Sequence, residues 1–452
     1  MRTTLSPHST AEHGAHSTTQ TTMACPIRRR RGRGSASWLA LALYWPWLAF
    51  AAPRLLDDTA AVTAVFVRVE ERLALMPRVA AAKWQAGARV VDPAREHVVL
   101  ERAAASAAAL GLSGSAALAS LQVRLARESQ VRYHTRWREQ GCSVATGCSV
   151  ALPLEDLRQQ LDRLAGELLH ALYLAAPAIA EPNFSHRYGD LAERLLAASI
   201  PLAADRAQLL AALGTLRQVG LPGWARVRAS GMLRLGVSGD YAPFSLVKNG
   251  QLRGADIELG LALAHELGLE PIFVATGWPT LLSDLADERF DVALGGVSVT
   301  PERAAVGLFS KPYYTGGKTI LARCTERARL NGLAALDSPE VRVIVNPGGT
   351  NERYVREHLR AAHILVYPDN RSIFKEIAAA RADAMITDDV EVDLQVRRHP
   401  TLCRTFPGTL TRADKALLMP PDPALKLVVD RWLQKQLTAG VPARLIKQFS
   451  QP

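Results

Sequence analysis

The stretch Leu233-Arg-Leu-Gly-Val237 opens a change of pattern in the second half of the chain. It is the first of five short β-like runs that alternate with amphipathic helical stretches. Such alternation predicts an α/β domain with largely parallel sheets. Two groups of runs, before and after Cys324, indicate two lobes with a cleft between them. The later runs are Pro271-Ile-Phe-Val274, Val292-Ala-Leu294, Val341-Arg-Val-Ile-Val345 and Ala384-Met-Ile386.

The preceding half differs in composition and in the spacing of its apolar residues. From Asp57 to about Val219 it is rich in Ala, Leu and Arg, and its apolar residues recur at helical spacing. Asp92-Pro93 reads as an N-cap followed by Pro at the first helical position. We therefore expect an all-α domain over 53–219, a linker over 220–228 and a two-lobed α/β domain over 229–451.

Composition favours folded domains and small anionic ligands. The chain has 452 residues, of which 48% are hydrophobic and 21% charged, and this argues against disorder and for more than one domain. The net charge is +11, but residues 1–51 hold six Arg against the single acid Glu12. The remaining excess of roughly +6 suits anionic small substrates better than nucleic acid.

The N-terminal segment predicts export. Residues 1–22 read as a solvated tail, or as the result of a start codon assigned ahead of Met23. From Met23, a basic run, an apolar stretch and Ala49-Phe50-Ala51 indicate a signal peptide over 23–51. A membrane anchor, the alternative, needs about 20 apolar residues, which is more than this segment has. We expect a periplasmic protein with no membrane anchor after cleavage.

The cysteines fit an oxidising compartment. Cleavage removes Cys25 and leaves four cysteines, an even number that favours two bridges. The domain division suggests the pairs Cys142–Cys148 and Cys324–Cys403. No CxxC or HExxH motif occurs, so we expect no catalytic metal and no cofactor.

Polar residues inside the apolar helices of the first half are the candidates for a site. Arg72 and Lys83 are eleven residues apart, which returns them to nearly the same helix face. Two long cationic side chains can thus converge on one ligand. Each candidate taken alone could equally be a solvated charge on a helix surface. The further candidates are Asp92, Arg95, Glu96, Gln130 and Arg158.

Four segments of this half carry a family resemblance: Glu71-Arg72-Leu73, Val79-Ala-Ala-Ala-Lys83-Trp84, Val91-Asp92-Pro-Ala-Arg95-Glu96 and Gln122-Val-Arg-Leu-Ala126-Arg-Glu-Ser-Gln130. Together they resemble the helical chorismate mutases of the exported, single-chain kind. That rearrangement is pericyclic, so preorganised cations suffice and no proton transfer is needed.

The resemblance implies a role for each candidate. It implies that Arg72, Arg95 and Arg158 hold the carboxylates of chorismate. Lys83 and Gln130 would donate to the breaking ether oxygen, and Glu96 with the Asp92 region would hold the ring hydroxyl. The chain departs from the family at Ala126, where Ser or Thr is common, and this predicts reduced affinity with activity retained. An inactive mutase remnant is the alternative, which the near-complete cationic set opposes.

The second half resembles the type II periplasmic amino-acid-binding proteins. Three segments carry that resemblance: Gly236-Val-Ser-Gly-Asp240-Tyr241-Ala-Pro243-Phe244, Gly254-Ala-Asp256-Ile-Glu258 and Asp291-Val-Ala-Leu-Gly-Gly-Val-Ser298-Val-Thr300-Pro-Glu-Arg303. This scaffold alone implies ligand capture, since a fold does not determine a function. A non-catalytic amino-acid-binding or sensing module, fused to an active mutase, is therefore one interpretation.

Further segments resemble periplasmic cyclohexadienyl dehydratase: Trp278-Pro279, Gly316-Gly-Lys318-Thr319, Val345-Asn346-Pro-Gly-Gly-Thr350-Asn351-Glu352, Tyr367-Pro-Asp369-Asn370 and Thr387-Asp388-Asp389-Val390-Glu391. Prephenate becomes phenylpyruvate by losing carbon dioxide and hydroxide, and hydroxide leaves poorly unless an acid protonates it. The resemblance implies that Glu391 is that acid and that Asn351 and Lys318 position the substrate.

The remaining cleft residues have supporting roles by the same resemblance. Arg303 would clamp a carboxylate and Trp278 would form a wall of the pocket. Asp388 would either hold the α-amino group of arogenate, a second substrate, or be structural. Lys318 belongs to no nucleotide loop, because the GxxxxGK[ST] spacing is absent. Further anion contacts are expected from Ser298, Thr300 and Thr350 with the amides beside it.

The two resemblances imply an exported bifunctional enzyme of phenylalanine biosynthesis. Its substrates would be chorismate and prephenate, with no nucleic-acid partner. The sequence leaves homo-oligomer formation and the choice between prephenate and arogenate open.

Overall fold

The computed structural model describes residue 53 and residues 55–142, 152–219 and 223–451. The expected signal peptide, most of the loop that contains Cys148 and part of the linker lie outside the described residues. Among the described residues, none of the helices is long and apolar enough to cross a membrane.

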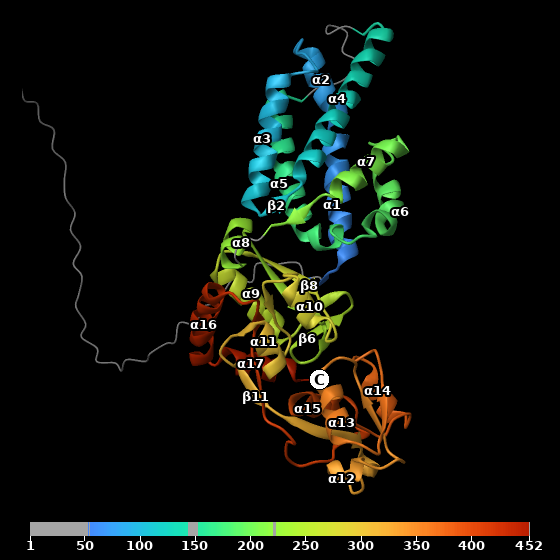
Figure 1. Ribbon diagram of the computed structural model, residues 1–452, viewed down its shortest axis with the longest axis vertical. Coiled ribbons are helices and arrows are strands. Elements are labelled where there is room, and N and C mark those ends of the chain that lie inside the picture. The colour runs from blue at the N-terminus through green and yellow to red at the C-terminus, as the bar shows by residue number, and fades with distance from the viewer. Residues whose placement is uncertain (1–52, 54, 143–151, 220–222, 452) are drawn as a thin grey trace, which may run out of the picture. The chain divides into compact units, whose positions relative to one another are not determined.

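Helices dominate residues 58–213 (Figure 1). Asp57 caps the first of them by accepting a hydrogen bond from the Ala60 N–H, and Asp92 caps the third with Pro93 at its start. The predicted cap at Asp92 is therefore confirmed. These helices are α1 (Asp58–Ala74), α2 (Met76–Gln85), α3 (Pro93–Ala109), α4 (Ser115–Glu139), α5 (Leu154–Ile179), α6 (Phe184–Leu196) and α7 (Ala203–Leu213).

The helical core forms where apolar residues recur at helical spacing. On α1, Val62, Val65, Phe66 and Val69 are fully buried and face one way, and α1 packs along α5. Burying each such side chain contributes about 1.5–3 kcal/mol. A few residues here are not helical: β2 (Leu112–Ser113) pairs antiparallel with β3 (Arg217–Gln218).

The first lobe of the α/β half contains a six-stranded sheet in the order β1-β8-β4-β9-β18-β10. Its centre is parallel, and β4 is buried along its whole length, including Arg234, which pairs with Asp291 at 2.9 Å. The edge strand β1 corrects the all-α assignment of 53–219, because it pairs in parallel with β8. The strands are β1 (Leu55–Leu56), β4 (Met232–Val237), β8 (Glu270–Ala275), β9 (Val292–Ala293), β10 (Leu308–Phe309) and β18 (Leu418–Met419).

The second lobe contains a five-stranded sheet in the order β14-β13-β15-β12-β16. The strand β13 runs parallel to β14 and β15, but β12 runs antiparallel to β15 and β16. The sheets are thus mixed, which corrects the expectation of largely parallel ones. The strands are β12 (Lys318–Arg323), β13 (Arg342–Val345), β14 (His363–Val366), β15 (Ala384–Asp388) and β16 (Leu402–Arg404).

The antiparallel strands arise because the chain crosses between the lobes twice. One crossing is β11 (Tyr314–Gly316), and the return crossing is β17 (Ala413–Lys415). The two pair antiparallel, with Tyr314 opposite Lys415. After the return, α16 (Pro423–Thr438) and α17 (Val441–Phe449) pack against α9 (Ala255–Glu266) of the first lobe.

Shorter elements complete the two lobes. Among them, α11 and α13 carry residues of the candidate site at their first turns. They are β5 (Asp240–Tyr241), β6 (Ser245–Lys248), β7 (Gln251–Arg253), α8 (Gly223–Ser230), α10 (Leu281–Ala286), α11 (Pro301–Val306), the 3₁₀ helix η1 (Cys324–Glu326), α12 (Leu333–Leu336), α13 (Thr350–His358), α14 (Ile373–Ala378) and α15 (Asp389–Arg398).

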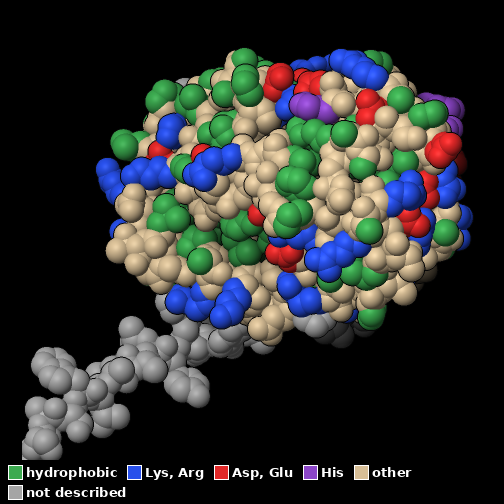
Figure 2. All heavy atoms as spheres, turned by 90° about the horizontal axis from the view of Figure 1, so that it is seen from below, with side chains coloured by type: hydrophobic (Ala, Val, Ile, Leu, Met, Phe, Trp, Pro, Cys, Tyr) green, Lys and Arg blue, Asp and Glu red, His purple; other side chains and the backbone are tan. Residues whose placement is uncertain are grey.

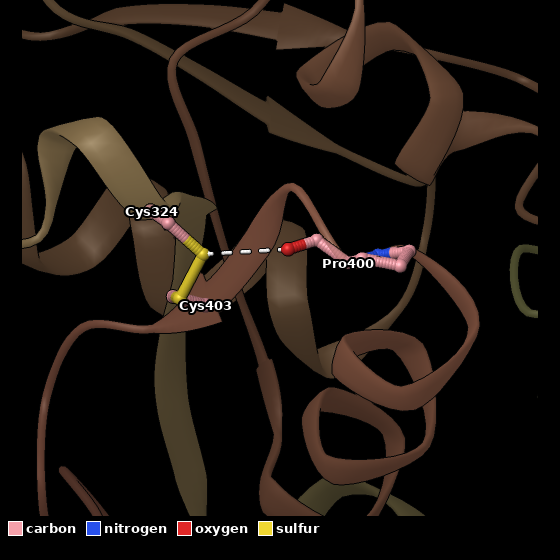
Figure 3. The surroundings of a disulfide bond; sticks show 3 residues. All are labelled: Cys324, Pro400 and Cys403. Carbon is pink, nitrogen blue, oxygen red and sulfur yellow. Dashed lines mark hydrogen bonds between the residues drawn. A yellow bond between two sulfur atoms is a disulfide. The ribbon is translucent and has the colours of Figure 1, made fainter.

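The second lobe contains the predicted disulfide between Cys324 and Cys403 (Figure 3). It ties η1 to β16 with the two Cα atoms 4.8 Å apart, and the Cys324 sulfur lies 3.8 Å from the Pro400 carbonyl oxygen. The pair Cys142–Cys148 stays a prediction, because Cys148 lies outside the described residues. On the face shown in Figure 2, basic side chains are spread among acidic ones and do not gather in one patch.

Candidate functional site

A cavity of about 380 Å³ lies between the first five helices. All seven polar residues singled out in the helical half line it, although they come from five different helices or helix starts. Arg72 and Lys83 converge here from α1 and α2, which corrects the expectation that they share one helix face. The same wall includes Ala126 and a long apolar stretch of Leu, Val and Ala side chains. The polar residues are Arg72, Lys83, Asp92, Arg95, Glu96, Gln130 and Arg158.

The two cations on α1 and α2 are held by few protein acceptors. Arg72 Nη1 donates to Gln122 Oε1 at 3.3 Å, and Lys83 Nζ donates to the Val90 carbonyl oxygen at 2.9 Å. Burial lowers the pKa of Lys83, and the negative charges of Asp92 and Glu96 oppose that shift. Burial likewise lowers the pKa of Arg72. Partly buried cations that have no bonded carboxylate among the described residues are suited to binding an anion in the cavity.

Gln130 is buried at the same cavity. Its Nε2 donates to the Ala126 carbonyl oxygen at 3.1 Å, while its Oε1 has no hydrogen-bond partner among the described residues. A buried amide with an unpaired end costs free energy unless a ligand supplies the missing partner. Rotating the amide would present its N–H₂ group to the cavity instead.

The acids and the outer arginines of the cavity are already paired. Asp92 accepts a hydrogen bond from the Arg95 backbone N–H at 3.1 Å, and Arg158 lies 3.4 Å from Glu155. Glu96 lies 3.5 Å from Arg127, which sequence reasoning missed. The signal was available, since Arg127 stands three residues before Gln130 and therefore on the same face of α4.

A second group of predicted residues converges between the two lobes. Most of them line a cavity of about 30 Å³, which has room for only a few water molecules. The space left between these side chains is therefore small. The predicted residues on this cavity are Trp278, Ser298, Arg303, Thr350, Asn351, Asp388 and Glu391, and the lining residues that were not predicted include Tyr241, Asn346, Asn370 and Lys415.

Two predicted residues lie outside this small cavity. Thr300 Oγ1 caps α11 by accepting from the Arg303 N–H at 3.4 Å, and its side chain lines a wider cavity at the mouth of the cleft. Lys318 is buried behind the wall, where its Nζ donates to Thr350 Oγ1 at 3.1 Å and to Asn351 Oδ1. Lys318 thus fixes the side chains that face the cavity.

Glu391 lies in the first turn of α15 and is 2% exposed. Its Oε2 accepts a hydrogen bond from Thr387 Oγ1 at 2.6 Å. Burial, together with the negative charges of Asp388 and Asp240, raises the pKa of Glu391 to about 8, although the Thr387 hydrogen bond lowers it. The carboxyl group is consequently protonated at neutral pH and can give up that proton.

A chain of hydrogen bonds orients Glu391. Asn351 Nδ2 donates to Thr387 Oγ1 at 3.0 Å, and that hydroxyl in turn donates to Glu391. Lys318 completes the chain through Asn351 Oδ1. The three residues predicted to act together are therefore connected through Thr387, whose part was not foreseen.

Asp388 is surrounded by donors. Its Oδ2 accepts from Tyr241 OH and Lys415 Nζ, each at 2.5 Å, and its Oδ1 lies 3.5 Å from Lys318 Nζ. Burial would raise the pKa of Asp388, but the charges of Lys415 and Lys318 outweigh burial and hold the pKa well below its usual range. Asp388 is thus ionised. Lys415 could have been noticed as the charge that directly precedes the apolar run Ala416-Leu-Leu-Met419.

Arg303 and Trp278 line the same small cavity. Arg303 Nη1 donates to the Ser298 carbonyl oxygen at 2.9 Å, and its guanidinium lies 5.9 Å from the centre of the Trp278 ring. Burial lowers the pKa of Arg303 to about 10, so it remains charged at neutral pH. Trp278 Nε1 donates to Asp240 Oδ1 at 3.1 Å, which fixes the ring.

The turn that carries Ser298 depends on two glycines. Gly295 and Gly296 have φ angles of 114° and 76°, and both N–H groups donate to Asp256 Oδ2, at 2.6 and 2.8 Å. A Cβ atom on Gly296 would lie 2.5 Å from the Phe244 ring. Only glycine fits there, so the turn holds Ser298 at a fixed place in the cleft.

Comparisons with known proteins concern the α/β half. Residues 233–451 match the family of bacterial extracellular solute-binding proteins, family 3. Cyclohexadienyl dehydratase of Pseudomonas aeruginosa is 44% identical over 218 residues, which are 48% of this chain and 81% of that protein. The L-cystine-binding protein of Escherichia coli K12 is 29% identical over 182 residues, 40% of this chain and 68% of that one.

A solved structure is also similar. The crystal structure of an ancestral amino acid-binding protein, a precursor of cyclohexadienyl dehydratase, is 32% identical, with a TM-score of 0.47. It covers 51% of this chain and 100% of its own. The family match and the 44% identical relative both lie in the two-lobed half. Through that half, the chain belongs to the bacterial extracellular solute-binding proteins of family 3.

Proposed function

We propose that the α/β half is a dehydratase that converts prephenate into phenylpyruvate. The observation that carries the proposal is Glu391, a buried carboxylic acid whose pKa is raised to about 8 beside a cationic wall. A pure binding site has no use for a proton donor, whereas expulsion of hydroxide requires one. The 44% identical cyclohexadienyl dehydratase supports the same activity.

The proposed step balances as follows. The ring carboxylate leaves as carbon dioxide, and the electron pair of the broken C–C bond enters the ring and makes it aromatic. The C–O bond to the ring hydroxyl breaks at the same time, and the leaving oxygen takes the Glu391 proton and departs as water. Glu391 then regains a proton from solvent. General acid catalysis of this kind contributes about 10²- to 10⁴-fold in rate.

The surrounding side chains would bind and orient the substrate. Arg303 remains charged and presents a planar fork that suits a carboxylate. The amide of Asn351, fixed by Lys318 and Thr387, would orient the ring next to Glu391. A ring diacid is far larger than the 30 Å³ cavity, so substrate would enter after the lobes separate about β11 and β17.

For the helical half, we infer a chorismate mutase. The cavity of about 380 Å³ is lined by the half-buried cations Arg72 and Lys83 and by Gln130, whose Oε1 has no hydrogen-bond partner among the described residues. Arg95 and Arg158 add two more cations for the carboxylates of chorismate. The electrostatic demand is met without an acid or base, since the ether oxygen only gains partial negative charge.

We further propose that residues 23–51 direct export and are removed after Ala51. The extracellular family of the α/β half is consistent with a periplasmic location. N-terminal sequencing of protein from the periplasmic fraction tests this, with a mature chain beginning at Ala52 as the expected result.

One coupled assay tests both activities. Protein lacking residues 1–51 is given chorismate alone, and phenylpyruvate is the expected product. Accumulation of prephenate would contradict the dehydratase assignment. Unconsumed chorismate would contradict the mutase assignment.

A second candidate for the α/β half is capture of an amino acid without turnover. The family and the 29% identical L-cystine-binding protein favour it. It predicts tight binding of an amino acid by calorimetry and no consumption of prephenate.

A further inference from the structure

Lys415 is a buried cation that the proposed reaction does not use. It ends β17, the strand by which the chain returns to the first lobe, and only 2% of its surface is exposed. Its Nζ donates to Asp388 Oδ2 at 2.5 Å and to Ser298 Oγ at 2.9 Å. It also lies 5.2 Å from the centre of the Tyr241 ring. The ammonium group is therefore placed by three residues at the floor of the cleft.

The Asp388 carboxylate is already satisfied by the chain. Tyr241 OH and Lys415 Nζ donate to one oxygen, and Lys318 Nζ lies 3.5 Å from the other. An ionised carboxylate in a ligand cleft would ordinarily attract the ammonium group of a ligand. Here a ligand ammonium would have to displace Lys415, and Asp388 is the one acid within salt-bridge distance of Lys415 in the part of the chain that the structure describes.

The charges facing the cleft point the same way. Among the described residues that line the small cavity, Arg303 and Lys415 are the cations, and Asp388 is the one ionised acid once Glu391 is protonated. The net charge of these side chains is positive, so the cavity favours a ligand with two carboxylates and disfavours a further ammonium group.

We propose that Lys415 determines specificity by occupying, beside Asp388, the position that the α-ammonium group of a ligand would take. The cleft would then select α-keto dicarboxylates over their α-amino counterparts. This inference rests on the proposed dehydratase function, for which the pair is prephenate and arogenate. The two share the ring, its carboxylate and its hydroxyl, and they differ at the keto or ammonium group of the side chain.

The first test uses protein lacking residues 1–51 with its native cleft. We expect kcat/KM for prephenate to exceed that for arogenate by about tenfold or more, the size of one charge-assisted hydrogen bond. Equal values, or a preference for arogenate, would overturn the inference while leaving the dehydratase function intact. If neither compound is turned over, the proposed function fails. Calorimetry with phenylpyruvate and L-phenylalanine then decides the inference alone, and tighter binding of L-phenylalanine would overturn it.

The second test changes the ammonium group itself. Lys415→Met keeps the length of the side chain and frees Asp388, so the prephenate-to-arogenate ratio of kcat/KM should fall by about tenfold. In the double variant Lys415→Met/Asp388→Asn, kcat/KM for arogenate should not rise relative to that for prephenate, because no carboxylate remains to bind the ammonium group of arogenate. Lys447→Met, at an exposed lysine of α17, is the matched control and should leave the ratio unchanged.

A purely structural role for Lys415 gives a different outcome. In that case Lys415→Met would lower both values of kcat/KM by the same factor, and the inference would be wrong. Circular dichroism and thermal unfolding identify a variant that does not fold. Lys415→Gln, which can still bond to Ser298, then replaces it with the same expected shift in the ratio.

Discussion

The two cavities of this protein differ in how each uses charge. In the helical half, Arg72 and Lys83 face an open cavity of about 380 Å³ and have few protein partners. In the α/β half, the charged groups are bonded to one another around a much smaller space of about 30 Å³. A rearrangement that moves no proton needs only cations in fixed places. A dehydration needs an acid kept protonated, and that in turn needs burial and a network to orient it.

The largest expected effect comes from substituting Glu391, the acid that only the α/β site has. Glu391→Gln keeps the shape of the side chain and removes its proton, so dehydratase kcat should fall by about 10²- to 10⁴-fold. Chorismate should still be consumed, and prephenate should accumulate in the coupled assay. Asp393→Asn, two residues further on α15, is the control and should retain both steps. Full dehydratase activity in Glu391→Gln would show that Glu391 is not the proton donor.

The next effect breaks the other site. Lys83→Ala removes the donor to the ether oxygen, and mutase kcat should fall by about 10²- to 10³-fold. Turnover of prephenate supplied directly should not change, as measured by phenylpyruvate formation. Arg78→Ala, at an exposed position of the same helix, serves as the control. A loss of both activities would mean that the two sites are not independent.

The pH dependence sharpens the contrast. Because the pKa of Glu391 is raised to about 8, the active form is the protonated one and is lost as pH rises through that value. Dehydratase kcat/KM should therefore fall by about tenfold per pH unit above 8. The pKa of Arg303 is lowered only to about 10, so its deprotonation does not explain a fall in kcat/KM that begins near pH 8. Mutase activity in the same samples should not share this fall, and a common fall would contradict the assignment.

The smallest effect concerns Ala126. Ala126→Ser adds a hydroxyl to the wall of the helical cavity, and one new hydrogen bond is worth about fivefold in affinity. KM for chorismate should fall by about that factor, while kcat and the dehydratase values stay as they are. An unchanged KM would show that the family's hydroxyl contact has no counterpart in this cavity.

The sequence by itself determined the local features and the candidates that are close together in the chain. The Asp92 cap and the buried strand β4 follow from side-chain type and from apolar spacing over a few residues. Glu391 and Asp388 were predicted from the segment Thr387-Asp388-Asp389-Val390-Glu391, which carries the resemblance to cyclohexadienyl dehydratase and spans the start of α15. The disulfide partners Cys324 and Cys403 followed from counting cysteines within one domain.

Only the tertiary structure decided which distant residues meet. Lys415 and Tyr241 reach Asp388 because the chain crosses twice between lobes, and no local pattern encodes the order of strands in a sheet. The edge strand β1 and the antiparallel strands of the second lobe were missed for the same reason. The periodicity of a segment reports which of its faces is buried, but hydrogen bonding between strands depends on partners that are far away in the chain.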